Sequence, residues 1–203
     1  MKYTIKNNPQ GTQEWLDDRK LHLTASQATA IATNGAGLKT LCFDLVWQNY
    51  CIQYEGYTSA DMERGNELEG VARTQYMFTT GSVVEEVGFA ELDEYVGVSS
   101  DGLVGKDGLV EIKCLKEKAY FSFLLYKKIK TAHIWQMQMQ MYVLERDWCD
   151  YVVYSDNFEE DLIIVRVYRD ERAIDAIKSG IISGKKLIKG YMKDYELALK
   201  ENK

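Results

Sequence analysis

The stretch GVSSDGLVGKDGLVEIKC, residues 97–114, constrains the fold more than any other part of the sequence. Two apolar runs, Val96–Val104 and Leu109–Cys114, flank the four-residue segment Gly105–Gly108. Short apolar runs joined by a turn rich in glycine are typical of a β-hairpin. We therefore predict that the two runs pair as antiparallel strands.

The second strand of this hairpin carries two charged residues among apolar ones. Because successive side chains of a strand point to opposite faces, Glu111 and Lys113 share one face. The other face carries Val110, Ile112 and Cys114 and is suited to a hydrophobic core. The strand is therefore predicted to bury one face and to display a carboxylate and an ammonium group on the other.

Asp101, ten residues before Glu111, completes a candidate site. On the neighbouring strand of the predicted hairpin it can approach Glu111. Two adjacent carboxylates repel unless a cation lies between them, and oxygen ligands suit Mg²⁺ or Mn²⁺. Lys113 could then stabilise charge on a metal-bound phosphate. In the alternative interpretation, Asp101 begins a turn, and Glu111 and Lys113 form an exposed pair of little energetic value.

The rest of the chain shows helical patterns in its first half and strand-like patterns from Val83 onward. Gln136–Met141 alternates like a strand, but Gln and Met favour helices and the flanking residues extend it to helix length. We predict helices at Thr12–Arg19, from Thr24, at Leu41–Tyr54, Ser59–Phe78, Ala119–Tyr126, His133–Leu144 and after Asp170, a loop at Asn34–Gly37, and strands at Trp148–Tyr154 and Asp161–Tyr168. This order indicates an α/β or α+β fold with a mixed sheet.

Length and composition limit what the chain can be. With 203 residues and 46% hydrophobic content, it is expected to form one domain over residues 1–203. No apolar run is long enough to span a membrane, and the first residues lack a cleavable signal. We therefore expect a soluble, cytoplasmic protein without a membrane partner.

The net charge and the few potential metal-binding residues argue against several further classes of protein function. A formal charge of −6 argues against indiscriminate coating of nucleic acid, although the lysine- and aromatic-rich run Lys116–Lys130 could form a local basic surface or an ordinary solvated helix face. Four cysteines without a CxxC pair and two isolated histidines, His22 and His133, support neither a zinc site nor a Ser/His/Asp hydrolase. A GxxxxGK[ST] phosphate loop is absent from the sequence, so ATP-driven activity is not expected.

Four sequence blocks in one order give the hairpin its context. The blocks are Gly11–Trp15 with Arg19 and Thr24–Ser26, Arg64–Glu69 with Ala72 and Arg73, Ser99–Leu103 with Glu111–Cys114, and Gln136–Gln138. Together they resemble the PD-(D/E)xK nuclease superfamily and, more narrowly, the YqaJ-like viral recombinases typified by phage lambda exonuclease. The resemblance implies a restriction-endonuclease-like core, a central mixed β-sheet flanked by helices, in a single nuclease domain.

The resemblance assigns the residues of a hydrolytic centre. It implies that Asp101, Glu111 and the carbonyl of Ile112 bind metal and that Lys113 is catalytic. Glu69 would be a further acidic group, acting on a second metal ion directly or through water. Glu67 competes for that role, but two residues apart on a helix they face different ways, so at most one points into the site. Gln136 would contact phosphate or the water network.

The resemblance also implies a pocket for a terminal 5′-phosphate, formed by Arg19, Ser26 and Ser99, because an Arg fork with hydroxyl donors suits a phosphate dianion. Met62 would be an apolar wedge that splits the duplex end, although a Met at helical spacing is more often core. Trp15 is predicted to anchor the core. Individually, the default interpretation of the Arg and the Ser residues is a surface arginine and two capping serines.

The activity implied is a Mg²⁺-dependent exonuclease with two ions per site, with Mn²⁺ as a possible substitute. It would digest one strand of double-stranded DNA from a 5′-phosphorylated end to mononucleotides and leave 3′ overhangs for recombination. A ring of three subunits, a single-strand annealing partner and a phage or prophage origin are part of the implication. The alternatives are a restriction-like endonuclease and a catalytically silent DNA-end-binding scaffold. Ser100 and Leu115 stand where the family often has proline, which affects only the expected local backbone path.

Overall fold

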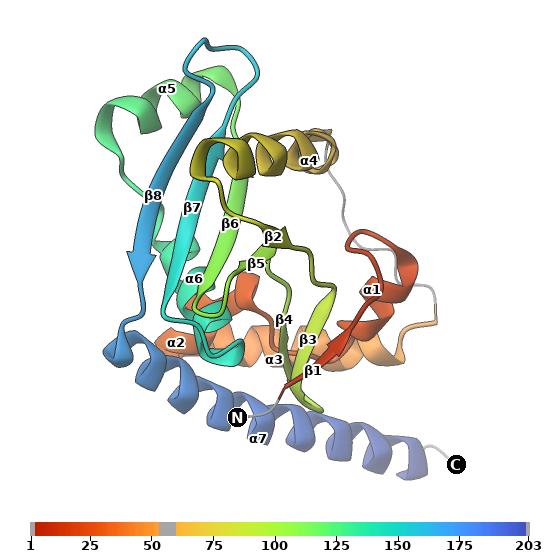
Figure 1. The fold of residues 1–203 in the computed structure, drawn as a ribbon. Coiled ribbons are helices and arrows are strands. Elements are labelled where there is room, and N and C mark those ends of the chain that lie inside the picture. The colour runs from red at the N-terminus through yellow and green to blue at the C-terminus, as the bar shows by residue number, and fades with distance from the viewer. Residues whose placement is uncertain (1–2, 53–59, 202–203) are drawn as a thin grey trace.

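The structure is a computed structural model that describes residues 3–52 and 60–201, without the side chains of residues 60–63. It has a mixed α/β architecture, as predicted, with two sheets (Figure 1). The large sheet has the order β2 (Val84–Glu85), β5 (Gly102–Val104), β6 (Gly108–Cys114), β7 (Trp148–Tyr154), β8 (Leu162–Tyr168). The small sheet has the order β1 (Thr4–Lys6), β3 (Phe89–Asp93), β4 (Val96–Val98). The large sheet is mixed because only β6 and β7 pair in parallel.

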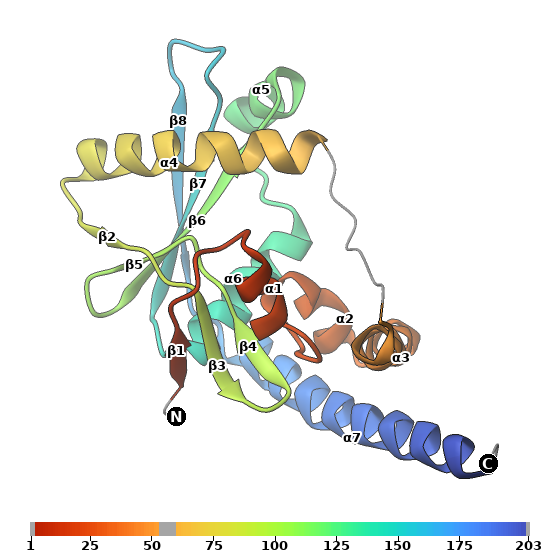
Figure 2. The ribbon, with the colours of Figure 1, turned by 90° about the vertical axis from the view of Figure 1, so that its right-hand side faces the viewer.

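Helices cover both faces of the large sheet. The helical elements are α1 (Gln13–Asp18), the 3₁₀ turn η1 (Ala25–Gln27), α2 (Ala28–Thr33), α3 (Ala36–Tyr50), α4 (Ala60–Thr80), α5 (Glu117–Tyr126), α6 (Thr131–Val143) and α7 (Glu171–Glu201). Figures 1 and 2 show α4 lying across one end of the large sheet and the long α7 crossing the opposite end of the molecule. No helix of the described residues is both long and apolar enough to cross a membrane.

The alternation of β6 separates two hydrophobic cores. Val110 and Ile112 pack toward α4 in a cluster with Ala72 and Tyr76. Leu109, on the other face, belongs to the larger core under α2, α6 and α7. The predicted apolar face of this strand is therefore confirmed, and its second face leads from the large core into the site described below.

The predicted hairpin is only half right. β5 and β6 pair antiparallel, with Gly102 opposite Val110, but the predicted strand Val96–Val104 is divided between the two sheets. The chain leaves the small sheet after Val98 and enters the large one at Gly102. The carbonyls freed at this crossing are bound by side chains: Gln140 Nε2 donates to the carbonyl of Ser99 (2.9 Å) and Gln10 Nε2 to that of Ser100 (2.8 Å).

Other predicted elements agree with the structure except for their first or last residues: the helix predicted from Thr12, for example, begins at Gln13. Thr12 caps α1, where its hydroxyl accepts from the N–H of Trp15 (3.3 Å). The predicted loop Asn34–Gly37 is shorter, because Asn34 ends α2 in the left-handed region (φ 50°) and α3 begins at Ala36. That helix ends at Tyr50; Tyr54 lies outside the described residues. The alternating Gln136–Met141 segment is helical, as predicted.

Close packing of α7 against the first helices depends on glycine. A Cβ atom at Gly180 would lie 1.8 Å from the carbonyl oxygen of Ile31 in α2. Gly190, two turns and more further along α7, has open space at the same position. The first half of α7 therefore approaches the backbone of α2 in a way that only glycine permits.

Candidate active site

One cavity of about 370 Å³ collects residues from all four sequence blocks. It lies where α1, η1, α4, α6 and the crossing between the two sheets meet. Met62 is the one predicted site residue whose side chain lies outside the described residues. The cavity is lined by all the others: Arg19, Ser26, Glu69, Ser99, Asp101, Glu111, Ile112, Lys113 and Gln136.

Glu111 is the centre of the hydrolytic group. Its side chain is completely buried, and Lys113 Nζ lies 2.5 Å from Oε1. Gln136 Nε2 donates to Oε1 (2.7 Å) and Gln140 Nε2 donates to Oε2 (2.7 Å). Both carboxylate oxygens are thus held by donors, which is the state that an ionised carboxylate requires in a buried position.

Asp101 lies just before β5, beside the second half of β6. Its Oδ2 accepts a hydrogen bond from the backbone N–H of Ile112 (2.6 Å). Desolvation and the charge of Glu111 raise the pKa of Asp101 well above its usual value. Desolvation opposes the charge on Lys113, but Glu111 and Asp101 outweigh it and raise the pKa of that ammonium group. Lys113 is therefore charged at neutral pH and acts as a donor and a positive charge.

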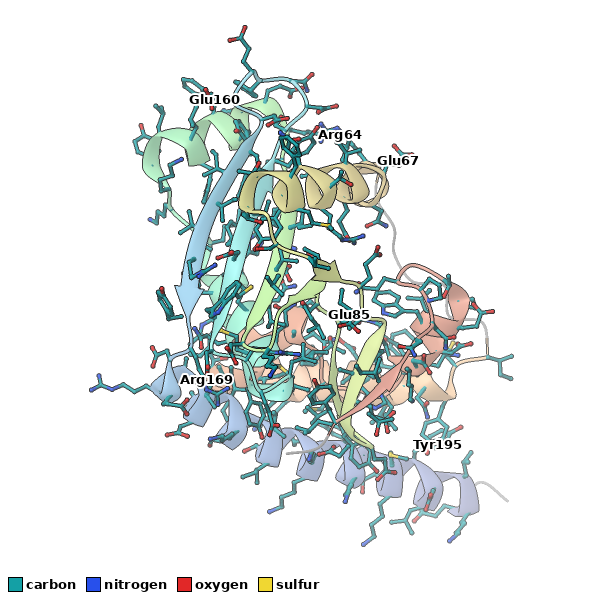
Figure 3. All side chains as sticks on the ribbon, viewed as in Figure 1. Arg64, Glu67, Glu85, Glu160, Arg169 and Tyr195 are labelled. Carbon is teal, nitrogen blue, oxygen red and sulfur yellow. The ribbon has the colours of Figure 1, made fainter. Side chains whose placement is uncertain are left out.

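Glu69 is the acidic residue of α4 that faces the cavity. Arg73 holds its Oε1 (2.5 Å), and desolvation raises its pKa against the opposing charge of Arg73. Glu67 is exposed and does not line the cavity; Figure 3 shows it on the outer side of α4. Of the two glutamates, Glu69 is therefore the one that faces the cavity.

The donor set fits a hard divalent cation. Carboxylates of Asp101 and Glu111 and the residue Ile112, with its backbone carbonyl, line one cavity, and the charge of Glu111 raises the pKa of both Asp101 and Glu69. A cation would offset this excess of negative charge. Within residues 3–52 and 64–201, no three His, Cys, Asp or Glu side chains converge closely enough to enclose an ion, so backbone oxygen and water would have to complete its shell.

A second group of residues forms another wall of the same cavity. The guanidinium of Arg19 stacks on the ring of Trp15 at 4.2 Å, and Trp15 Nε1 donates to Ser99 Oγ (2.9 Å). Ser26 is exposed, and its hydroxyl makes a long hydrogen bond with the hydroxyl of Thr24 (3.3 Å between the oxygens). In the described part of the chain Arg19 has no carboxylate partner, so its charge is available to an anion. Desolvation lowers its pKa to about 10, and it remains protonated.

Comparison with known proteins identifies the family. Residues 14–147 match the model of the YqaJ-like viral recombinase domain. The chain belongs to this family. The alkaline exonuclease LHK-Exo from Laribacter hongkongensis is 33% identical, with a TM-score of 0.84 over 93% of this chain and 99% of its own. The same enzyme in complex with dAMP matches with a TM-score of 0.83, also at 33% identity and over the same shares of the two chains.

A phage-related exonuclease from Haemophilus somnus 129PT shares the fold, with a TM-score of 0.74 at 16% identity over 88% of this chain and 98% of its own. Comparison with curated proteins gave no match. The family and the nuclease-type fold expected from the sequence blocks are therefore confirmed.

Three features of this YqaJ-like site were missed or misassigned at the level of sequence. Trp15 was expected in the core, but α1 has no buried residue and Trp15 forms part of the cavity wall. Its spacing of four from Arg19, one helical turn, was the available signal. The same spacing links Gln136 to Gln140, which also holds Glu111. Arg73 was noted only as part of a block, yet it pairs with Glu69.

Proposed function

We propose that the chain is a DNA exonuclease that digests one strand of a duplex from its 5′-phosphorylated end. The observation that carries the proposal is the shared cavity: the buried Glu111 with its half-buried partner Lys113 lines the same cavity as Arg19, which has no carboxylate partner among the described residues. The similarity to alkaline exonuclease LHK-Exo supports the reaction class. Its complex with dAMP, a mononucleotide, supports release of single nucleotides.

The hydrolytic wall provides charges for attack on a phosphodiester. When bound by Asp101, Glu111 and the Ile112 carbonyl, Mg²⁺ ions would activate water and stabilise the leaving 3′-oxygen, and two ions suit this chemistry. The Lys113 ammonium would donate to the non-bridging phosphate oxygens as charge builds on them. Gln136 would orient water from the side of Glu111. Glu69 would accept a proton or hold a water of the second ion. The water oxygen would form a bond to phosphorus as the P–O3′ bond breaks, the leaving 3′-oxygen would take a proton, and the released nucleotide would keep its 5′-phosphate.

The wall formed by Arg19, Ser26 and Ser99 favours an exonuclease over an endonuclease. Arg19, Ser26 and Ser99 present a guanidinium and two hydroxyls, a set that matches a terminal phosphate dianion better than the single charge of an internal phosphodiester. Binding this extra charge would position the end before each cut.

The remaining parts of the proposal rest on the family. They are the 5′-to-3′ direction, a homotrimeric ring around the DNA, 3′ overhangs passed to a single-strand annealing protein, action in the bacterial cytoplasm during phage recombination, and Met62 as a wedge at the duplex end. Sedimentation of the purified chain would test the ring: a mass of three chains of 23.4 kDa is expected.

One time course tests the central claim. Linear duplex DNA with a labelled 5′- or 3′-end is incubated with Mg²⁺ or with EDTA, beside the same DNA as a closed circle. We expect mononucleotides from the 5′-end of the linear form with Mg²⁺ only, and none from Lys113→Ala. Cutting of the circle would instead indicate an endonuclease, and binding of ends without cutting would indicate a silent scaffold.

A further inference from the structure

A buried glutamine that lies outside the predicted site connects its two walls. Gln140 is fully buried on α6, one turn after Gln136. The Nε2 atom of Gln140 donates both to the backbone carbonyl of Ser99 (2.9 Å) and to Glu111 Oε2 (2.7 Å). Its two N–H groups are therefore shared between the crossing segment of the small sheet and a carboxylate on the large sheet.

The orientation of this amide is fixed by its neighbours. Both atoms that face Nε2 are acceptors, so a flipped amide would direct Oε1 at a carbonyl and a carboxylate. In the part of the chain that the structure describes, Oε1 of Gln140 has no hydrogen-bond partner although it is buried. An unpaired buried acceptor costs stability. A purely stabilising role therefore does not explain a glutamine at position 140.

We infer that Gln140 is a positioning residue that sets the Glu111 carboxylate and Ser99 in register with one another. The inference rests on the proposed function and adds to it a residue that touches neither substrate nor metal. By holding Oε2, Gln140 fixes the plane in which Glu111 presents its oxygens to a cation. By holding the Ser99 carbonyl, it fixes the strand end that carries the Ser99 hydroxyl of the phosphate pocket.

The helix offers a matched control two residues away. Gln138 is also buried on α6, and its amide also has two partners, the carbonyl of Tyr168 (2.8 Å) and the N–H of Asp170 (2.8 Å). These partners lie at the end of β8 and the start of α7 and do not line the cavity. Gln140→Met and Gln138→Met thus remove comparable buried hydrogen bonds, and only the first touches the site.

Three readouts separate positioning from stability: thermal unfolding, Mn²⁺ binding by calorimetry without DNA, and the ratio of digestion rates for 5′-phosphoryl and 5′-hydroxyl ends. Both variants are expected to lower the Tm. Gln140→Met is expected to weaken Mn²⁺ binding by about 10–100-fold, as loss of an outer partner of a ligand does, and to reduce the end preference. Gln138→Met should retain the wild-type affinity and preference.

If the two variants had equal Mn²⁺ affinity and equal end preference, the positioning role of Gln140 would be wrong. Digestion of DNA by the wild-type chain would in that case still support the proposed function. A wild-type chain that neither binds Mn²⁺ nor digests DNA would remove both. Should Gln140→Met not fold, Gln140→Asn against Gln138→Asn gives the same comparison: the shorter amide keeps its polarity but cannot reach Ser99 and Glu111 together.

Discussion

Asp101 and Ile112 are joined by a hydrogen bond of 2.6 Å from the backbone N–H of Ile112 to Oδ2 of Asp101. This bond holds the carboxylate against β6, one residue from Glu111 on the strand. The position has a cost, because desolvation and the charge of Glu111 raise the pKa of Asp101. The acid is thus held in a place where its ionised form is unfavourable without a compensating cation.

Asp101→Asn is therefore expected to reduce digestion strongly and to stabilise the metal-free chain. The amide oxygen of the substituted side chain can still accept a hydrogen bond from the N–H of Ile112, but the negative charge that repels Glu111 is removed. We expect a Tm increase of about 2–4 °C in EDTA, the shift that about 1 kcal/mol gives in a chain of this size, with activity reduced by about 100-fold or more. Asp107→Asn, exposed on the turn of the same hairpin, is the control and should change neither. A lower Tm for Asp101→Asn would contradict the unfavourable charge.

Arg73 is expected to support catalysis through Glu69. Its guanidinium binds Glu69 (2.5 Å) and the exposed Glu86 (2.8 Å). In Arg73→Met, burial and the charge of Glu111 would raise the pKa of Glu69 further. We expect kcat to fall by about 10–100-fold, the effect of losing the partner of a site carboxylate, with little change in KM. Glu86→Gln leaves the pair of Arg73 with Glu69 intact and should behave like wild type. An equal fall in kcat in Glu86→Gln would show that the effect comes from the surface pair of Arg73 with Glu86.

Two glycines of α7 should respond oppositely to alanine. At Gly180 a Cβ would collide with the Ile31 carbonyl, so Gly180→Ala is expected to lower the free energy of unfolding by about 1–3 kcal/mol or more. At Gly190 the space is open, and Gly190→Ala should raise it by about 0.5–1 kcal/mol through helix propensity. Urea unfolding of the two variants measures both. Equal effects would show that α7 does not approach α2 as closely as described.

Stability should fall in mild acid because of His133. Its Nδ1 lies 2.7 Å from the hydroxyl of Tyr151, and desolvation together with the charge of Lys113 lowers its pKa from 6.5 to about 4. A histidine with a lowered pKa in the folded state contributes stability that is complete above pH 6.5 and lost as the pH falls toward 4. His22, whose pKa burial also lowers, adds to the same trend. Urea unfolding of His133→Asn between these pH values should show a smaller decline than wild type; an unchanged slope would contradict the lowered pKa.

Much of this site was predictable because its key residues are local. The period of two in β6 places Glu111 and Lys113 on one face, and the sequence blocks predict which distant residues join them. The division of Val96–Val104 was not predictable from its strand-like pattern. It depends on Gln10 and Gln140, which are remote in sequence and bind the carbonyls freed at the crossing. Trp15 was misassigned for a similar reason: a large aromatic side chain usually indicates core, and only the tertiary arrangement shows the ring under Arg19.

The crossing at Ser99–Asp101 has a consequence for product size. Ser99 follows the last strand of the small sheet, whereas Glu111 and Lys113 belong to the large one. In the proposed reaction, the DNA end is therefore bound next to the small sheet and hydrolysed next to the large sheet. If the proposed reaction holds, the separation between Ser99 and Glu111 would set how many nucleotides leave at each step.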